Sequence, residues 1–144
     1  MKNVTNGLMA GLTATVVLSI LMVLKGMMGL MPDLNVIAML SAQMSSGAAM
    51  GWLAHFMIGV IGYGLAYSLV FGNLPLGGHG LRGIILGVVG WLVMMVVLMP
   101  MMGGGLFGTA MPSGMMVPVA TLVLHAIFGA VLGLSYARLN RSGT

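Results

Sequence analysis

Charged residues are absent from three long stretches of this chain, and their absence decides which class of protein it can be. No Asp, Glu, Lys or Arg occurs between residues 3 and 24, between 34 and 81, or between 83 and 137. Charged residues make up 4% of the chain, and Asp33 is the only acidic one. A water-soluble domain carries about 25% charged residues. The sequence therefore predicts an integral membrane protein.

Four segments are long enough to cross a membrane. A transmembrane helix needs about 20 mainly apolar residues, and the segments lie at about 8–28, 48–71, 81–101 and 115–137. Helices are favoured because hydrocarbon offers the backbone no partners, and because barrel strands would alternate polar with apolar residues. We expect an all-α membrane protein with a single domain over residues 1–144, whose four transmembrane helices form an up-down bundle.

The cations are shared unevenly between the two sides of this bundle. One side carries Lys2, Arg82, Arg138 and Arg141, and the other carries Lys25 and Asp33. The positive-inside rule then places both termini in the cytoplasm. Because the cations flank apolar segments, the net charge of +4 indicates membrane orientation, with the lipid bilayer as partner and no nucleic acid. Aromatic residues near the two boundaries are expected to form a membrane-interface belt: Tyr67, Tyr136 and Trp52.

The segments between the spans differ in character. After the Met31-Pro32 break, Asp33 is predicted to cap a short helix over about 34–44, lying along the outer membrane surface. The loop between the second and third spans contains His79, which we expect to be solvated.

The chain consists of two similar halves, each a helix hairpin. Gly7 and Gly11 in the first span match Gly83 and Gly87 in the third, at an offset of 76 residues. In the second and fourth spans the offset is 70 residues, and the matching residues are His55 with His125, Gly59 with Gly129, and, after a gap of one residue, Tyr67 with Tyr136. Such a parallel repeat has a pseudo-twofold axis along the membrane normal.

Two histidines, His55 and His125, are the strongest functional candidates. Each lies about eight residues, roughly 12 Å, from the outer end of its span. An ionisable group inside a membrane is a functional candidate by default. Small residues one turn above and below each ring share its helix face: Gly51 and Gly59 around His55, and Thr121 and Gly129 around His125. Diagonal helices in a four-helix bundle leave room for a flat cofactor, so we expect a b-type haem with bis-histidine ligation.

Other readings of the same residues stay open. Each histidine can instead hydrogen-bond a neighbouring helix, and glycines at spacing four favour close helix packing. The chain would then be a structural or accessory subunit of a larger membrane complex, or would form a homo-oligomer. A third possibility is Cu(I) binding, because thioethers select that ion and 12 of the 18 methionines lie near the outer side. Enzymatic activity is not expected, since one carboxylate cannot form an acid–base pair.

Several motifs resemble a known group of proteins. They are the runs Gly7–Gly11, Met28–Pro32, Gly51–Gly59 and His125–Gly133. Together they are similar to a group of small bacterial four-helix inner-membrane proteins of unknown function. The resemblance covers most of the chain. It implies a bacterial inner membrane location and supplies no catalytic residues.

Overall fold

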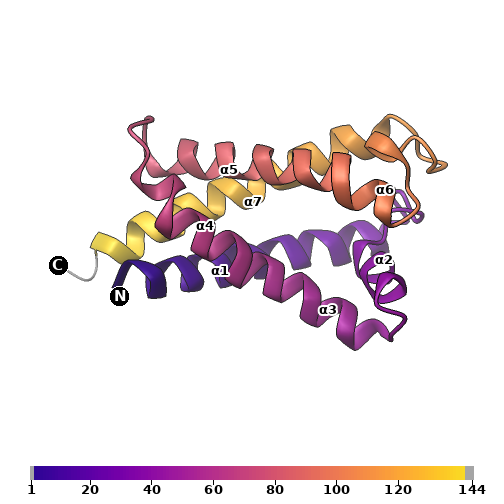
Figure 1. Ribbon diagram of the computed structural model, residues 1–144, viewed down its shortest axis with the longest axis horizontal. Coiled ribbons are helices and arrows are strands. Elements are labelled where there is room, and N and C mark those ends of the chain that lie inside the picture. Colours follow the sequence, from indigo (N-terminus) through magenta and orange to yellow (C-terminus); the bar gives the residue numbers. More distant parts are fainter. Residues whose placement is uncertain (1, 142–144) are drawn as a thin grey trace.

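The fold is a bundle of four long apolar helical rods. The computed structural model describes residues 2–141, of which the Lys2 side chain is left undescribed, and this part of the chain contains helices and no strand. The rods run side by side along the long axis of the molecule (Figure 1). In chain order they are α1 (Lys2–Met27); a second rod of α3 (Ala48–Met57), η1 (Ile58–Tyr63), α4 (Gly64–Leu69) and η2 (Phe71–Asn73); a third of α5 (His79–Val93), η3 (Met94–Leu98) and α6 (Met99–Met101); and α7 (Met116–Arg141).

All four rods have the length and composition of membrane spans. The apolar segments are 3–27, 48–73, 79–101 and 116–141, with 23 to 26 residues each. The predicted all-α membrane architecture is therefore confirmed. The predicted first span began at residue 8, whereas the helix begins at Lys2, because the polar residues of its first turns do not stop a helix from forming. We call the end of the bundle that carries α2 (Val36–Gln43) the α2 end, and the opposite end the terminal end.

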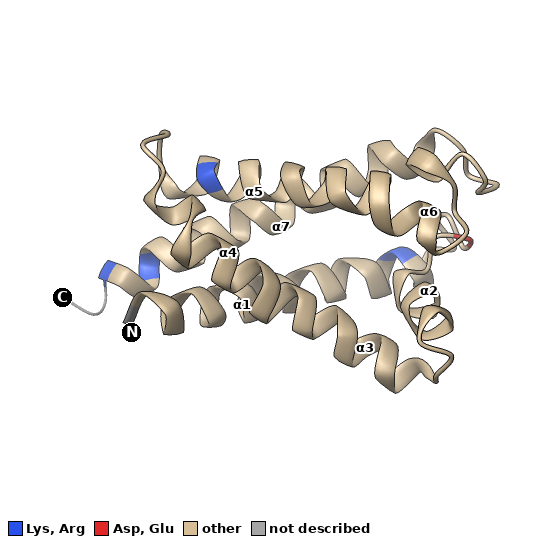
Figure 2. Ribbon diagram, in the orientation of Figure 1, with Lys and Arg blue, Asp and Glu red and all other residues tan. Residues whose placement is uncertain are grey.

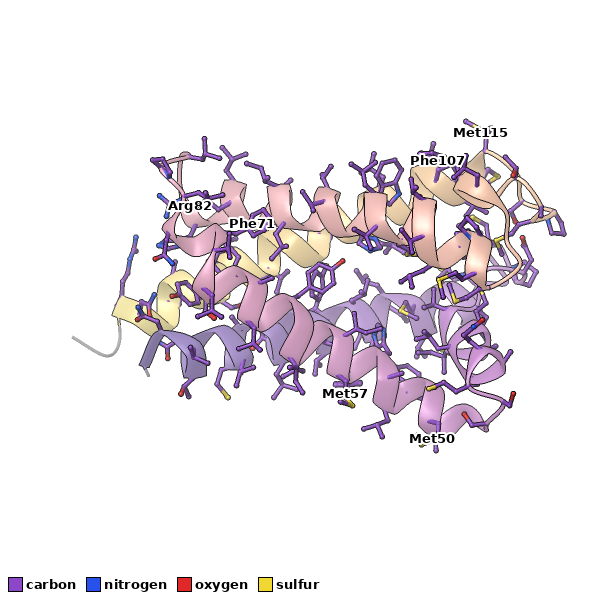
Figure 3. The ribbon with its side chains drawn as sticks, in the orientation of Figure 1. Met50, Met57, Phe71, Arg82, Phe107 and Met115 are labelled. Atoms are coloured by element: carbon purple, nitrogen blue, oxygen red, sulfur yellow. The ribbon has the colours of Figure 1, made fainter. Side chains whose placement is uncertain are left out.

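Large apolar side chains cover the outside of the bundle. Met50 and Met57 of α3 point away from the other rods (Figure 3), and Ile20 of α1 is 54% exposed. Exposure of such a surface to water would cost free energy, whereas lipid tails solvate it. Contact with a lipid bilayer follows from this apolar exterior.

The rods are packed in the order second span, α1, α7, third span. The helix α1 packs against both α7 and the η1–α4 part of the second span, and α5 packs closely against α7. The second and third spans meet mainly near the terminal end, through α4 and η2, and they separate toward the α2 end (Figure 1). The second span and α7, which carry His55 and His125, are thus diagonal partners.

Glycines bring the paired helices into backbone contact. A Cβ atom added at Gly83 would overlap the carbonyl oxygen of Gly129, and one added at Gly129 would overlap that of Gly83. In the first hairpin, a Cβ at Gly11 would lie 2.8 Å from the carbonyl oxygen of Gly59. Both hairpins therefore use glycine to let helices approach closely, as expected for small residues at spacing four.

The one-residue gap in the sequence repeat has a structural counterpart. Eight residues separate Gly59 from Tyr67, but seven separate Gly129 from Tyr136. The longer interval contains η1, a π-helical segment, whereas α7 is an uninterrupted α-helix. A π turn spans i to i+5 instead of i to i+4 and so holds one more residue. The π segment absorbs the extra residue, and the two tyrosines still meet, with ring centroids 5.0 Å apart.

The short helix α2 crosses the α2 end of the bundle between α1 and α3 (Figure 1). Its N-cap is Asn35, whose side chain accepts a hydrogen bond from the Ala38 amide, so the predicted cap at Asp33 is wrong. Asp33 instead joins the two loops of this end, accepting hydrogen bonds from the Ser113 amide (3.1 Å) and hydroxyl (2.5 Å). Asn caps a helix as well as Asp does. Asn35 can therefore cap α2 while the carboxylate of Asp33 binds Ser113.

The aromatic residues of the terminal end are part of the core. Tyr67 and Tyr136 are 0% and 2% exposed, so they do not form the predicted interface belt. Both rings contact the ring of His79, and the Nδ1 atom of His79 lies 3.0 Å from the Tyr67 hydroxyl. The expectation of a solvated His79 is therefore corrected: it is half-buried, because α5 begins at this residue and packs against α7.

Candidate functional site: a cavity between the diagonal histidines

A cavity of about 760 Å³ lies where the second and third spans separate. The helices α1 and α7 contribute to its lining together with both separated spans, and Leu34, Ile37 and Leu40 close it at the α2 end. Its walls are predominantly apolar. Cavities of roughly 300–1,000 Å³ with apolar walls and a few polar groups are typical of ligand sites.

Both candidate histidines line this one cavity. Gly59 and Thr121 line it with them, whereas Gly51 and Gly129 do not. Gly51 packs against the Ile37 carbonyl and Ser41 of α2, and Gly129 packs against α5. The structure thus brings four of the six predicted site residues to one cavity and gives the other two glycines positions at helix contacts.

The ring of His125 has a fixed orientation. Its Nδ1 lies 2.8 Å from the backbone carbonyl of Thr121, one turn earlier in α7. A carbonyl oxygen can only accept, so Nδ1 carries the hydrogen and donates. In the neutral ring the Nε2 lone pair is then available. A histidine whose Nδ1–H is bound to a carbonyl is also the usual form of a metal ligand.

The ring of His55 is held by a serine of α1. Its Nε2 lies 3.2 Å from the Ser19 hydroxyl, which itself donates to the Thr15 carbonyl at 2.7 Å. The serine has one hydrogen, so Nε2–H of His55 donates to the serine oxygen. The Nδ1 lone pair of His55 is then free. Ligation through Nε2 would require this contact with Ser19 to break.

Aromatic side chains support the cavity from within its lining, as Tyr63 does, and from outside it, as Trp91 does next to Thr121. Trp91 donates from its indole nitrogen to the Pro118 carbonyl and the Thr121 hydroxyl, both at 3.1 Å. Tyr63 packs edge-on against Phe128 and reaches across to Gly90 of the third span, where a Cβ atom would overlap its hydroxyl. Within residues 2–141 this hydroxyl has no hydrogen-bond partner. Through its contact with Gly90, Tyr63 bridges the separated second and third spans.

Both π-helical segments contribute to the cavity. Gly62 and Tyr63 of η1 line one wall, and Met94 and Leu98 at the two ends of η3 line another. Single π turns inside α-helices occur frequently at functional sites. Their placement on two facing walls of one cavity supports a ligand-binding role for it.

The ligand set of the cavity is small. In the part of the chain that the structure describes, no group of three or more His, Cys, Asp or Glu side chains comes together. A closed zinc site takes four such ligands. A haem group would need only two such side chains from the protein, and His55 and His125 are the two histidines that line the cavity.

Methionines form a second feature near the same end. Met94, Met95 and Met99 are buried in one core cluster, and further methionines pack against it: Met31, Met39 and Met111. The Met95 sulfur lies 4.0 Å from the Thr121 hydroxyl. This methionine cluster therefore adjoins the cavity wall.

Comparison with known proteins gives a family. The sequence matches DUF6789, a family of unknown function, over residues 1–144. The chain belongs to the DUF6789 family. No curated protein and no solved structure matches it significantly. DUF6789 membership supplies no activity, and the cavity is the feature of this DUF6789 chain that bears on function.

Three residues of the site were not predicted from the sequence: Lys25 and Tyr63, which line the cavity, and Ser19, which contacts His55 from outside the lining. A signal for Ser19 was present, because Gly11, Thr15 and Ser19 follow at spacing four and so share one face of α1. From the sequence, Lys25 indicates only which side of the membrane the end of the first span lies on. Tyr63 gave no signal, since its role depends on the separation of the second and third spans.

Proposed function

We propose that this DUF6789 protein is a small, non-catalytic haem-binding protein of the membrane, with His125 and His55 as the axial ligands of a b-type haem. One observation carries the proposal. Two histidines that are 70 residues apart, on diagonal helices, line one apolar cavity of about 760 Å³.

The residues present fit such a group. The apolar walls suit a porphyrin ring, and the volume is within the range of sites for drug-sized ligands. His125 is oriented by the Thr121 carbonyl and offers Nε2. His55 offers Nδ1 as it stands, or Nε2 once Ser19 is released. Held by two histidines, such a group would supply single-electron transfer and no site for oxygen. The role would therefore be electron transfer or structure.

The orientation and location belong to the same proposal. Arg82, Arg138 and Arg141 all lie at the terminal end, and Lys25 lies at the α2 end (Figure 2). This asymmetry supports cytoplasmic termini. The resemblance noted above supports the bacterial inner membrane. The cavity would then lie nearer the outer face, and a larger membrane complex or a second copy of the chain would be the electron partner.

The optical spectrum tests the proposal. Protein purified from haem-replete cells should show a sharp Soret band and narrow α and β bands on reduction. His55→Ala and His125→Ala should each abolish this spectrum or convert it to high spin. His79→Ala is the matched control, because His79 lies outside the cavity lining, and it should keep the wild-type spectrum.

Two outcomes distinguish the proposed function from the structural role. Folded, colourless protein from such cells refutes haem binding and favours the structural or accessory role, in which His55 serves its hydrogen bond to Ser19. A spectrum retained in Ser19→Ala but lost in His55→Ala would assign His55 a ligand role beyond that hydrogen bond.

A second candidate function is Cu(I) binding by the methionine cluster. The observation that favours it is the packing of six methionines in one cluster at the α2 end. Methionine is also a flexible apolar filler, so this function ranks below haem binding.

A further inference from the structure

Lys25 is a cation at the edge of an apolar cavity. It lies in the last turn of α1, and its side chain is part of the cavity lining at the α2 end. Its ammonium group donates to three backbone carbonyls, those of Leu30 (3.1 Å), Met31 (3.0 Å) and Leu34 (2.8 Å). The side chain thus folds back onto the loop that follows α1. These three bonds occupy the hydrogens of the ammonium group, and among the described residues that line the cavity Lys25 is the only charged one.

Inside the cavity the charge of Lys25 meets no counterion from the described residues, although Asp33 attracts it from outside the lining. Asp33 is the only carboxylate side chain of the sequence, and both of its oxygens are taken by Ser113. It does not line the cavity. A cation in apolar surroundings is costly unless it is paired, and an ionisable group inside a membrane usually has a functional partner. An anionic group on the cavity side of Lys25 would add to the attraction of Asp33, and this points to the ligand.

We infer that the ligand of the cavity is an amphipathic carboxylate, with its apolar body between the separated spans and its carboxylate beside Lys25. The inference rests on the cavity being the binding site proposed above, and it specifies the polar end of the ligand. Two sources share this chemistry: the propionates of a haem and the head of a free fatty acid.

Paired probes with and without the carboxylate test the inference. The first pair is iron protoporphyrin IX and its dimethyl ester, followed by the Soret band. The second pair is palmitate and methyl palmitate, followed by equilibrium binding. Both are measured with full-length protein at one detergent concentration, and each affinity is corrected for partition of the probe into protein-free micelles.

The acid of at least one pair should bind roughly tenfold more tightly than its ester, about the ratio expected for one pair of opposite charges near a protein surface. Lys25→Gln keeps amide donors for the loop carbonyls but removes the charge, so the preference should vanish. Lys25→Arg should keep it. Arg82→Gln is the matched control, because Arg82 also donates to loop carbonyls, those of Leu76 and Gly72, but at the terminal end.

Each outcome decides between the proposals. Equal binding of acid and ester in the wild type overturns the role of Lys25 even if the haem spectrum is present, and this comparison needs no variant to fold. Palmitate binding that depends on Lys25, in protein that takes up no haem, supports the inference and refutes the haem function. Failure of all four probes to bind refutes both.

Discussion

The backbone contact between α5 and α7 gives the sharpest stability prediction. Gly129 of α7 and Gly83 of α5 approach so closely that a Cβ atom on either residue would overlap the carbonyl oxygen of the other. Both colliding groups belong to helix backbones, so no side-chain rotation can relieve the overlap. We predict that Gly129→Ala forces α5 and α7 apart.

The expected magnitude follows from two opposing effects. Overpacking in a well-packed core costs typically 1–3 kcal/mol, and contact with a rigid backbone favours the upper part of that range. Replacing a helical glycine by alanine returns about 1 kcal/mol through helix propensity. Gly129→Ala should therefore lower the free energy of unfolding by about 2 kcal/mol. Gly62→Ala is the matched control, because its Cβ would meet nothing within 4 Å, and it should leave stability unchanged or raise it by up to about 1 kcal/mol.

Equilibrium unfolding in mixed micelles, followed by far-ultraviolet circular dichroism, measures the difference between the two variants. Which of the two variants has the lower free energy of unfolding is more informative than either value alone. If Gly129→Ala is as stable as Gly62→Ala, the backbones of α5 and α7 are not in contact and the packing described here is wrong.

Three further predictions concern the ends of the bundle. Single cysteines at the exposed residues Gln43 and Ala110 should react with an impermeant thiol reagent from the periplasmic side and one at Leu76 should not; the opposite pattern would reverse the orientation, and Ser142 is a less useful probe because it lies outside the described residues. Desalted protein should retain no stoichiometric Cu(I) under reducing conditions. If copper is retained, retention should fall when the three buried methionines of the cluster are replaced together by leucine: Met94, Met95 and Met99. The hydrogen bonds from Ser113 lower the pKa of Asp33 below its ordinary value of 3.8, so their contribution to stability is complete above that pH and is lost as the pH falls through the lowered pKa; thermal melting of Asp33→Asn should lack this acid dependence.

The spans could be predicted from the sequence because their signal is local. Length, hydropathy and the positions of Lys25, Arg82 and Arg138 mark the ends of apolar segments without any knowledge of packing. The pairing of His55 with His125 was also accessible, since the internal repeat places both at one depth and up-down order makes their helices diagonal. Local patterns thus brought the two rings to one region of the bundle.

The shape of the site was not accessible in the same way. The sequence does not say that the second and third spans separate toward the α2 end, and this separation creates the cavity and gives Tyr63 its bridging position. The flanking glycines were ambiguous for a related reason. A glycine that makes room for a ligand and a glycine that makes room for a helix obey the same spacing. Only the packing shows that Gly59 lines the cavity as well as contacting α1, whereas Gly129 contacts α5.

The π turn in the second span changes how the chain can tolerate a shift in length. Removing one residue from an α-helix rotates every later side chain by about 100° relative to the earlier ones. Such a deletion in α7 would turn Tyr136 out of the core. Deleting Val60 inside η1 would instead convert the π turn into an α turn and leave Tyr67 facing Tyr136 as before. The second span therefore has one position where a one-residue deletion would leave the packing of the terminal end unchanged. The same deletion would shorten the wall of the cavity.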